Sequence, residues 1–499
     1  MNSSGQLYET YKTKMQRIAD IKAAGAVLQW DQETYLPKSG AHFRGQQIST
    51  LSELAHDLFS DEALGSVLNE LAAKEDLSSE QKKAVERTLE DYTKNKKYSS
   101  SFVRAISEQI NKTFHSWIEA RKQASFAVYQ KDLDALVQLK KEETEILGYT
   151  GHPYDALLDE FEKGATVSLL DTTFATLLPP LKEFFKKLTA APQVDDSFLF
   201  QNFPEKEQWT WGMHLIKELQ FDFERGRQDK SEHPFSTSFS PQDVRITTRI
   251  DEADFGNMTW SCIHETGHAL YEQGLPPDQY GLPLGEACSY SIHESQSRLW
   301  ENNVGRSKGF WQHWYPQLQE HFPSQLSSVS LDRFYKGINK VQPSLVRTEA
   351  DEISYHFHVA IRYELEKRLI EGSLSIQDIP TFWNEQYKTY LGMDVPDDKR
   401  GCLQDVHWSH GSFGYFPTYS LGSFYAAQFF AKAEEQITGL DEKIAAGNTL
   451  PLLEWLRVNI HRHGRYYTSE ELCKVVTGEG LNPGYFMRYA EKKYETIYF

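Results

Sequence analysis

Apolar residues recur at intervals of three and four along most of this chain. The pattern is clearest in residues 7–30, 63–74 and 176–191, and it is typical of α-helices that bury one face. No low-complexity segment, fixed-period repeat or long linker rich in proline and glycine interrupts it. We therefore predict a mostly α-helical fold.

One segment has a different period. In residues 242–251 apolar and β-branched side chains alternate with more polar ones, which is typical of a strand with one apolar and one cationic face. The alternating residues are Val244, Ile246, Thr248 and Ile250 on one side, and Arg245, Thr247 and Arg249 on the other. We expect a small β-sheet here, beside the helix that follows. The strand either lines a groove or belongs to a structural hairpin with solvated arginines.

The chain has 499 residues, enough for roughly three average domains or for one large helical body. We expect a single domain over residues 1–499. Residues 191–209 have a loop-like composition and are the best candidate for a subdomain boundary.

The formal net charge is −18, from 53 basic and 71 acidic residues. Such an acidic chain has no general electrostatic attraction for nucleic acid or anionic membranes, so neither partner is expected. The N-terminal segment is polar, and no apolar run is long enough to span a bilayer. We therefore expect a cytoplasmic protein without a signal peptide. The four cysteines are scattered without metal-type pairs, and we expect them to be reduced and buried.

Residues 261–274, SCIHETGHALYEQG, contain His264, Glu265 and His268 in the order H-E-x-x-H. In a helix the two histidines stand one turn apart on the same face, so both imidazoles can bind one metal ion. Glu265 points about 100° away and can instead take a proton from a water molecule on the ion.

This first helix is expected to be capped by Asn257 or Thr259 and to end at Gly274. The H-E-x-x-H motif is short enough to occur by chance. A helix with surface histidines therefore remains an alternative.

A third ligand is needed, because catalytic zinc sites usually take three protein ligands and leave one position open. Glu294, on a second helix predicted over residues 284–303, supplies it. Small residues around Glu294 would let the two helices approach closely. Glu286 and Glu301 are rival carboxylates. We expect Glu301, two turns away, to face solvent, and His293 to lie beside the site or in the core.

Attack by a metal-bound water on a carbonyl group also needs donors for the developing oxyanion besides the metal. The glycine-flanked aromatic stretch 409–419 offers His410, Tyr415 and Tyr419, and His407 lies just upstream of it. The spacing does not choose between the two tyrosines, and each of the four is alternatively a structural side chain.

Arginine is the residue best suited to bind a free carboxylate, because its planar guanidinium does so with two hydrogen bonds. The candidates are Arg347, Arg245 and Arg249. Because Arg347 precedes a helix rich in acidic residues, an intrahelical ion pair is the alternative for it.

Several stretches resemble the thermostable metallocarboxypeptidases of the Taq type. The resemblance rests on HETGHALYEQG (264–274) and SIHESQS (291–297), and on four further motifs in order: HPF (233–235), DVRIT (243–247), VRTEAD (346–351) and GCLQDVHW (401–408). Residues 30–40 and 409–422 are also similar to that family. The resemblance spans nearly the whole chain, and its one departure, Val346 where the family often has isoleucine, is conservative.

The resemblance implies a single, mostly helical body with a deep substrate groove, similar to neurolysin-like peptidases. It implies zinc or cobalt as the metal and a homodimer as the assembly. His264, His268 and Glu294 match the family's metal ligands, and Glu265 matches its general base. Four motifs correspond to the closed end of the groove, where the substrate's C-terminus is held; besides the arginines they contain His233, Asp243, Thr247, Asp351 and Gln404.

The expected function is therefore a metal-dependent carboxypeptidase that releases C-terminal amino acids from peptides with broad specificity. The nearest enzymatic alternative is an oligopeptidase that cleaves internal bonds. An alternative from another class is a scaffold that binds peptides without turnover. The presence of Glu265 argues against the scaffold, because a binding protein has no use for a general base.

Overall fold

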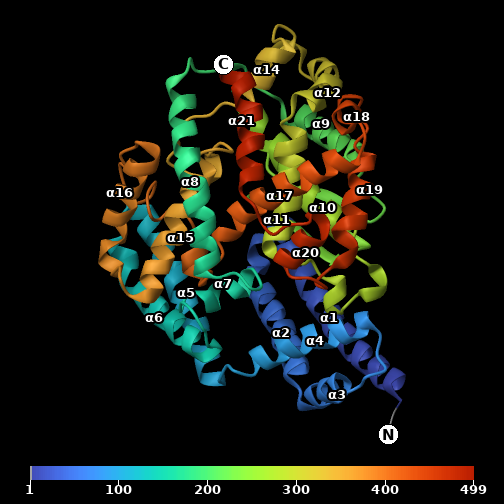
Figure 1. Cartoon of the computed structure of the whole chain (residues 1–499). Helices are drawn as coiled ribbons and strands as arrows, with labels where there is room; N and C mark the ends of the chain where they lie inside the picture. Colours follow the sequence, from blue (N-terminus) through green and yellow to red (C-terminus); the bar gives the residue numbers. More distant parts are fainter. Residues whose placement is uncertain (1–2) are drawn as a thin grey trace. The chain divides into compact units, whose positions relative to one another are not determined.

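The computed structural model describes residues 3–499, and most of them are helical, as the sequence predicts (Figure 1). They form two compact units. The first comprises residues up to Lys96 together with Asp195–Ile338 and Phe429–Gly480. The second comprises Lys97–Val194, Asn339–Gln428 and Leu481–Phe499. One change of unit follows Val194, inside the loop-like stretch 191–209.

The first unit begins with helices that follow the apolar spacing of the sequence. Its helices are α1 (Ser4–Thr34), α2 (Ala41–Ser60), α3 (Glu62–Ala72), α4 (Ser79–Asn95), α9 (Glu205–Glu218), α10 (Phe255–Glu272), α11 (Tyr290–Arg298), α12 (Lys308–His321), α13 (Pro323–Leu326), α14 (Leu331–Gly337), α18 (Leu440–Ala445), α19 (Leu450–Asn459) and α20 (Ser469–Thr477). A capping box between Ser3 and Gln6 starts α1, because each side chain satisfies a backbone N–H that the helix leaves free.

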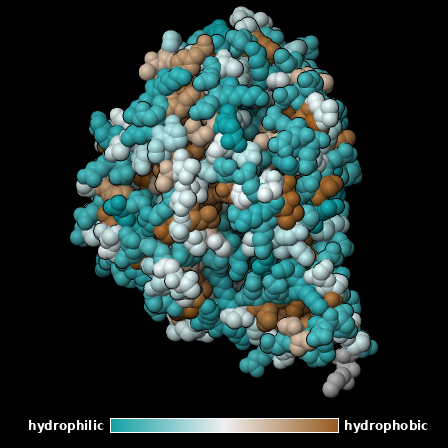
Figure 2. Space-filling model, viewed as in Figure 1, coloured by the Kyte–Doolittle hydropathy of each residue, from teal (hydrophilic) through white to brown (hydrophobic). Residues whose placement is uncertain are grey.

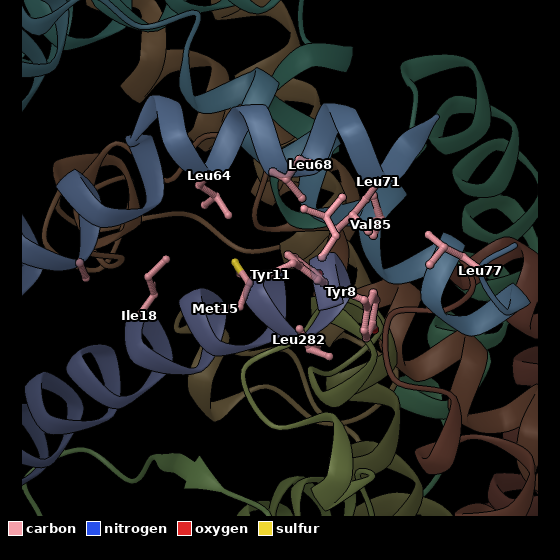
Figure 3. Close-up of a cluster of buried hydrophobic side chains, with 12 residues drawn as sticks. Tyr8, Tyr11, Met15, Ile18, Leu64, Leu68, Leu71, Leu77, Val85 and Leu282 are labelled. Atoms are coloured by element: carbon pink, nitrogen blue, oxygen red, sulfur yellow. The ribbon is translucent and has the colours of Figure 1, made fainter. Parts of the chain in front are cut away.

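A hydrophobic cluster joins α1, α3 and α4 in this unit (Figure 3). Tyr11 and Met15 of α1 point toward Leu64 and Leu68 of α3, and Val85 of α4 closes the cluster. These positions are the ones at three- and four-residue spacing, so the periodic pattern marks the buried faces.

The second unit is wholly helical apart from its loops. It contains α5 (Ser100–Gln123), α6 (Ala127–Leu147), α7 (Asp155–Phe161), α8 (Val167–Ala190), α15 (Tyr355–Glu371), α16 (Ile379–Leu391) and α21 (Gly484–Tyr498). Helix α17 (Pro417–Gln436) begins in this unit and ends in the first.

The small sheet lies in the first unit and confirms the predicted strand. Its order is β1 (Gly226–Lys230), β3 (Asp243–Thr248), β2 (Ser236–Ser240), with β1 parallel and β2 antiparallel to β3. Val244 and Ile246 are buried against α10. Arg245 lies on the opposite face, where its guanidinium stands 4.4 Å from the ring centre of Trp30.

Two helix starts differ from the prediction. Asp254 caps α10, not Asn257 or Thr259, because its carboxylate accepts the Gly256 N–H at 2.8 Å. Helix α11 starts at Tyr290 rather than near residue 284, because the hydroxyl of Ser289 caps it.

The face of the molecule in Figure 2 is largely hydrophilic, with apolar side chains in small separate groups. Among the described residues, no helix combines the length and the apolar character that crossing a bilayer demands.

Candidate active site

Helix α10 presents the two histidines of the H-E-x-x-H motif side by side. Their rings are 4.9 Å apart between centroids, as expected for residues one turn apart. Glu294 comes from α11, and its Oε2 lies 3.6 Å from Nε2 of His264 and 3.5 Å from Nε2 of His268. The structure thus brings the three predicted ligands together, with one ligand atom of each within 4.8 Å of the others.

These residues fit a divalent metal ion. Two imidazole nitrogens and one carboxylate oxygen are the donor set of catalytic zinc sites, and cobalt accepts the same donors. Both Nε2 atoms face the same carboxylate oxygen. Burial, then the neighbouring His293, lowers the pKa of His268 to about 3, so this ring is neutral and has a lone pair to offer.

The opposite nitrogen of each histidine is engaged with an oxygen. Nδ1 of His264 lies 2.9 Å from Oε2 of Glu301, and Nδ1 of His268 lies 3.0 Å from the carbonyl oxygen of His293. His293 also places Nδ1 at 2.6 Å from Nδ1 of His268 and Nε2 at 2.9 Å from Glu272. These contacts orient both rings with Nε2 toward Glu294.

The expectation that Glu301 faces solvent is wrong. Seven residues are close to two full helical turns, so Glu301 lies on the same side of the helix as Glu294. The chain runs as a π-helix over Leu299–Gly305, and Glu301 is buried in it against His264. Arg298 and Arg306 approach Glu301 at 3.3 and 3.4 Å. Although burial would raise the pKa of Glu301, these charges lower it to about 2.

Glu294 is held as an anion. Burial would raise the pKa of its carboxyl, but Arg298 and the two histidines hold it well below its usual range. Nε of Arg298 donates to Oε1 at 2.7 Å, whereas Oε2 accepts from the hydroxyl of Ser297 at 3.1 Å and faces the histidines.

Glu265 is buried beside these three residues. Burial raises the pKa of its carboxyl to about 7, although His264 opposes the shift. The hydroxyl of Ser236, at the start of β2, hydrogen-bonds to this carboxyl group. A carboxyl with a pKa close to neutral can both accept and return a proton at physiological pH.

Helices α10 and α11 touch through Gly267, between the two histidines. A methyl group there would lie 2.6 Å from Cα of Ser297 and 2.7 Å from the carbonyl oxygen of Gln296. Both neighbours are backbone atoms that cannot turn aside, so α11 would have to move away from α10.

Gly267→Ala is therefore expected to displace Glu294 and to weaken zinc binding, with an overpacking cost of about 1–3 kcal/mol in stability. Zinc content after dialysis and thermal unfolding would measure both effects. Gly309→Ala in α12 is the matched control, because its added methyl group would meet Ala445 at an ordinary 3.6 Å. Equal zinc retention in the two variants would contradict the close-packing argument.

Arg347 lies in the second unit and is buried. Its Nε and Nη2 donate to Oδ1 of Asp405 at 3.0 and 2.9 Å, and its Nη1 donates to the hydroxyl of Tyr355 at 3.1 Å. Nε of Arg362 donates to the other oxygen of Asp405 at 2.7 Å. Burial opposes ionisation of Arg347 and of Asp405, yet Asp405 holds the pKa of Arg347 well above its usual range, and the two arginines hold the pKa of Asp405 well below its own.

Gln404 and Asp351 support this arginine cluster. Oε1 of Gln404 accepts from the backbone N–H of Arg347 at 2.9 Å and from Nη2 of Arg362 at 2.7 Å. The carboxylate of Asp351 accepts the N–H groups of Ile353 and Ser354 at 2.9 and 3.0 Å, which orders the start of α15.

The aromatic stretch after residue 406 packs around the same arginine. The ring of Tyr419 lies 4.8 Å from the Arg347 guanidinium, and its hydroxyl is 3.2 Å from Nε2 of His407. Burial, reinforced by Arg347, lowers the pKa of His407 to about 3. Tyr415 stacks edge-on against Tyr419 at 5.2 Å. His410 lies apart from these rings, against Phe114 at 5.0 Å.

The remaining predicted residues surround the sheet of the first unit. Asp243 binds Arg245 through two 3.0 Å hydrogen bonds. Thr247 is buried and accepts the backbone N–H of Phe235 at 2.9 Å, which ties the HPF segment to β3. The carbonyl oxygen of His233 accepts the hydroxyl of Ser231 at 2.6 Å.

Sequence reasoning missed Asp405, Arg362, Arg298 and the buried Glu366. Glu366 accepts hydrogen bonds from Trp408 at 2.7 Å and from the backbone of Gly414 at 2.8 Å, and thereby fixes the loop that carries Tyr415. One signal was available: Arg362 and Glu366 lie one turn apart in a helix of mostly apolar residues, and buried charges in such a helix require partners.

Comparison with known proteins gives a consistent result. A family model for carboxypeptidase Taq (M32) metallopeptidase matches residues 10–494. Carboxypeptidase 1 of Bacillus subtilis is 38% identical over 486 residues, 97% of each chain. A solved M32 carboxypeptidase from Deinococcus radiodurans is 37% identical with a TM-score of 0.97, covering 99% of each chain. A structure described as "The Structure of CHT" is 58% identical with a TM-score of 0.97, covering 98% of this chain and 99% of that chain.

Proposed function

We propose a residue-level mechanism for this chain, which belongs to the carboxypeptidase Taq (M32) metallopeptidase family and is a metallocarboxypeptidase. The proposal rests on one observation above all: a buried glutamate lies directly beside a convergent set of two histidines and one carboxylate. The oligopeptidase alternative has no such support from the named relatives, which are carboxypeptidases.

His264, His268 and Glu294 would hold the metal, and we propose zinc, with cobalt as the alternative. A divalent ion held there would act as a Lewis acid on the attacking water and the scissile carbonyl. Glu265 takes the proton of the water as it attacks. The same carboxyl group, with its pKa near 7, then returns a proton to the leaving amine.

Tyr415, Tyr419, His407 and His410 are proposed as the source of oxyanion donors. The hydroxyl of Tyr419 lies 3.2 Å from Nε2 of His407, whose lowered pKa keeps its ring neutral, so that it can orient the phenol by a hydrogen bond. Tyr415 is the second phenol of the same aromatic group. His410 is the weakest candidate, because its ring packs on Phe114 instead.

Arg347 is proposed to bind the substrate's C-terminal carboxylate, and Arg245 is the second candidate for the same role. Among the described residues, the carboxylate paired with Arg347 and Arg362 is that of Asp405, so these three side chains carry an excess of one positive charge. A buried cation is costly without a counter-ion, and a peptide carboxylate would supply one. His233, Asp243 and Thr247 of the first unit, and Asp351 and Gln404 of the second, are proposed to contribute to substrate binding, since several of them fix the arginines or the adjacent backbone.

Amidating the substrate's C-terminus is expected to lower the rate at least about tenfold, because each charged hydrogen bond is worth about 1.5–3 kcal/mol. Arg347→Ala should remove most of that discrimination, whereas Arg249→Ala, which removes an exposed arginine, should not. Mass spectrometry of paired free and amidated peptides would measure the ratio. Equal cleavage of both peptides by the wild type would exclude carboxylate capture.

Assembly and location are further parts of the proposal. We propose peptides with a free C-terminus as the substrates and a homodimer as the assembly, which light scattering of the purified protein would test. All four cysteines are free and buried, and this supports the reducing compartment expected from the sequence.

A further inference from the structure

We infer that Glu301 and Arg298 are positioning residues that set how tightly the metal is held and which atoms hold it. Glu301 fixes His264, and Arg298 fixes Glu294. The inference rests on the proposed ligand set and adds the residues that hold two of those ligands in place.

The first contact fixes a tautomer. Because an ionised carboxylate only accepts hydrogen bonds, the Nδ1 of His264 that faces Glu301 at 2.9 Å must carry the proton. In the neutral ring, the form that can bind a metal, Nε2 is then the nitrogen with the free lone pair, and this atom faces Oε2 of Glu294 at 3.6 Å. A carboxylate behind the ring also makes the imidazole a stronger donor.

The second contact fixes the number of oxygen ligands. Arg298 binds Oε1 of Glu294 at 2.7 Å, so only Oε2 is left to face the two histidines. A carboxylate restrained in this way would offer one oxygen to a bound metal ion, which would leave room for water and substrate. The same guanidinium lies 3.3 Å from Glu301, so Arg298 contacts both Glu301 and the proposed ligand Glu294.

The two histidines are supported unequally. Behind His268 lie the carbonyl oxygen and the ring of His293. Glu272 contacts this ring and not His268 itself. Behind His264 stands the carboxylate of Glu301 itself, in direct contact and buried. Removing the charge of Glu301 should therefore affect the metal more than removing that of Glu272.

Glu301→Gln keeps the size of the side chain and loses the charge. Competition between the purified apo-protein and a chromophoric chelator for Zn²⁺ should show affinity weakened about 10–100-fold. Glu286→Gln is the matched control, because Glu286 is also paired with an arginine, Arg465 at 2.8 Å, and has no contact with the three ligands. Zinc affinity of Glu301→Gln within threefold of the control would overturn the inference.

Arg298→Lys provides a second, independent measurement. A lysine keeps the charge but cannot bridge two carboxylates with a planar fork. The visible absorption of the Co²⁺-loaded variant should differ from that of the wild type, because Glu294 is free to bind through both oxygens; an unchanged spectrum would contradict the inference. If Glu301→Gln fails to fold, as judged by circular dichroism, the cobalt spectrum of Arg298→Lys decides whether the inference holds. Glu294→Ala tests the proposed ligand set separately from the inference about Glu301 and Arg298. If this variant retains full zinc, the ligand set itself is wrong.

Discussion

Glu265→Gln is expected to keep its metal and to lose at least about 10²–10⁴-fold in kcat. The amide has the size and polarity of the carboxylate but cannot accept the proton of the attacking water. Glu265 is not among the three convergent ligand residues, so its loss should leave zinc content unchanged. Metal analysis and peptide turnover on the same sample would separate the two effects.

Two outcomes for Glu265→Gln would contradict its role as the general base. Turnover of Glu265→Gln close to that of the wild type would transfer the role of base to another residue. Loss of zinc together with activity would instead make Glu265 a structural part of the metal centre. Neither outcome is expected from a side chain that contacts Ser236 and lies beside the ligands.

His268→Ala should lose both zinc and activity. Three protein ligands form the proposed set, and an alanine leaves only His264 and Glu294. Peptide turnover should then fall to the level of the chelator-treated wild type, and added zinc should not restore it. The same result is expected for an alanine at either of the other two ligand positions.

His214→Ala is the matched control for this experiment. His214 is also half-buried in the first unit, but its partner is Gln317 at 3.2 Å and it takes no part in the metal set. Full zinc occupancy in purified His268→Ala would rule out the assigned ligands, whatever its activity.

The sequence predicts the elements whose pattern arises from burial. The helices follow from apolar spacing, and β3 follows from the alternation of Val244 and Ile246 with Arg245. β1 and β2 escape prediction because their residues are mostly polar, and pairing with β3 rather than their own composition keeps them extended.

The site is predictable where spacing along one helix defines it. His264 and His268 are one turn apart, so their convergence follows from helix geometry alone. Asp405 and Arg362 are far apart in sequence, and only the folded chain shows that they form a buried ion pair. Glu301 fails for another reason: two helical turns return it to the side of Glu294, and only the folded chain shows that His264 lies against it there.

The π-helix at Leu299–Gly305 also limits how this protein can be engineered. A π-helix has i→i+5 hydrogen bonds and therefore more residues per turn than an α-helix. This irregularity makes it an obvious target for stabilisation. Deleting a residue ahead of Glu301 would regularise the backbone and rotate that carboxylate by about 100°, away from His264. Thermostabilisation by helix idealisation would then come at the expense of metal retention, so in this enzyme the irregular turn is the part of the scaffold to leave untouched.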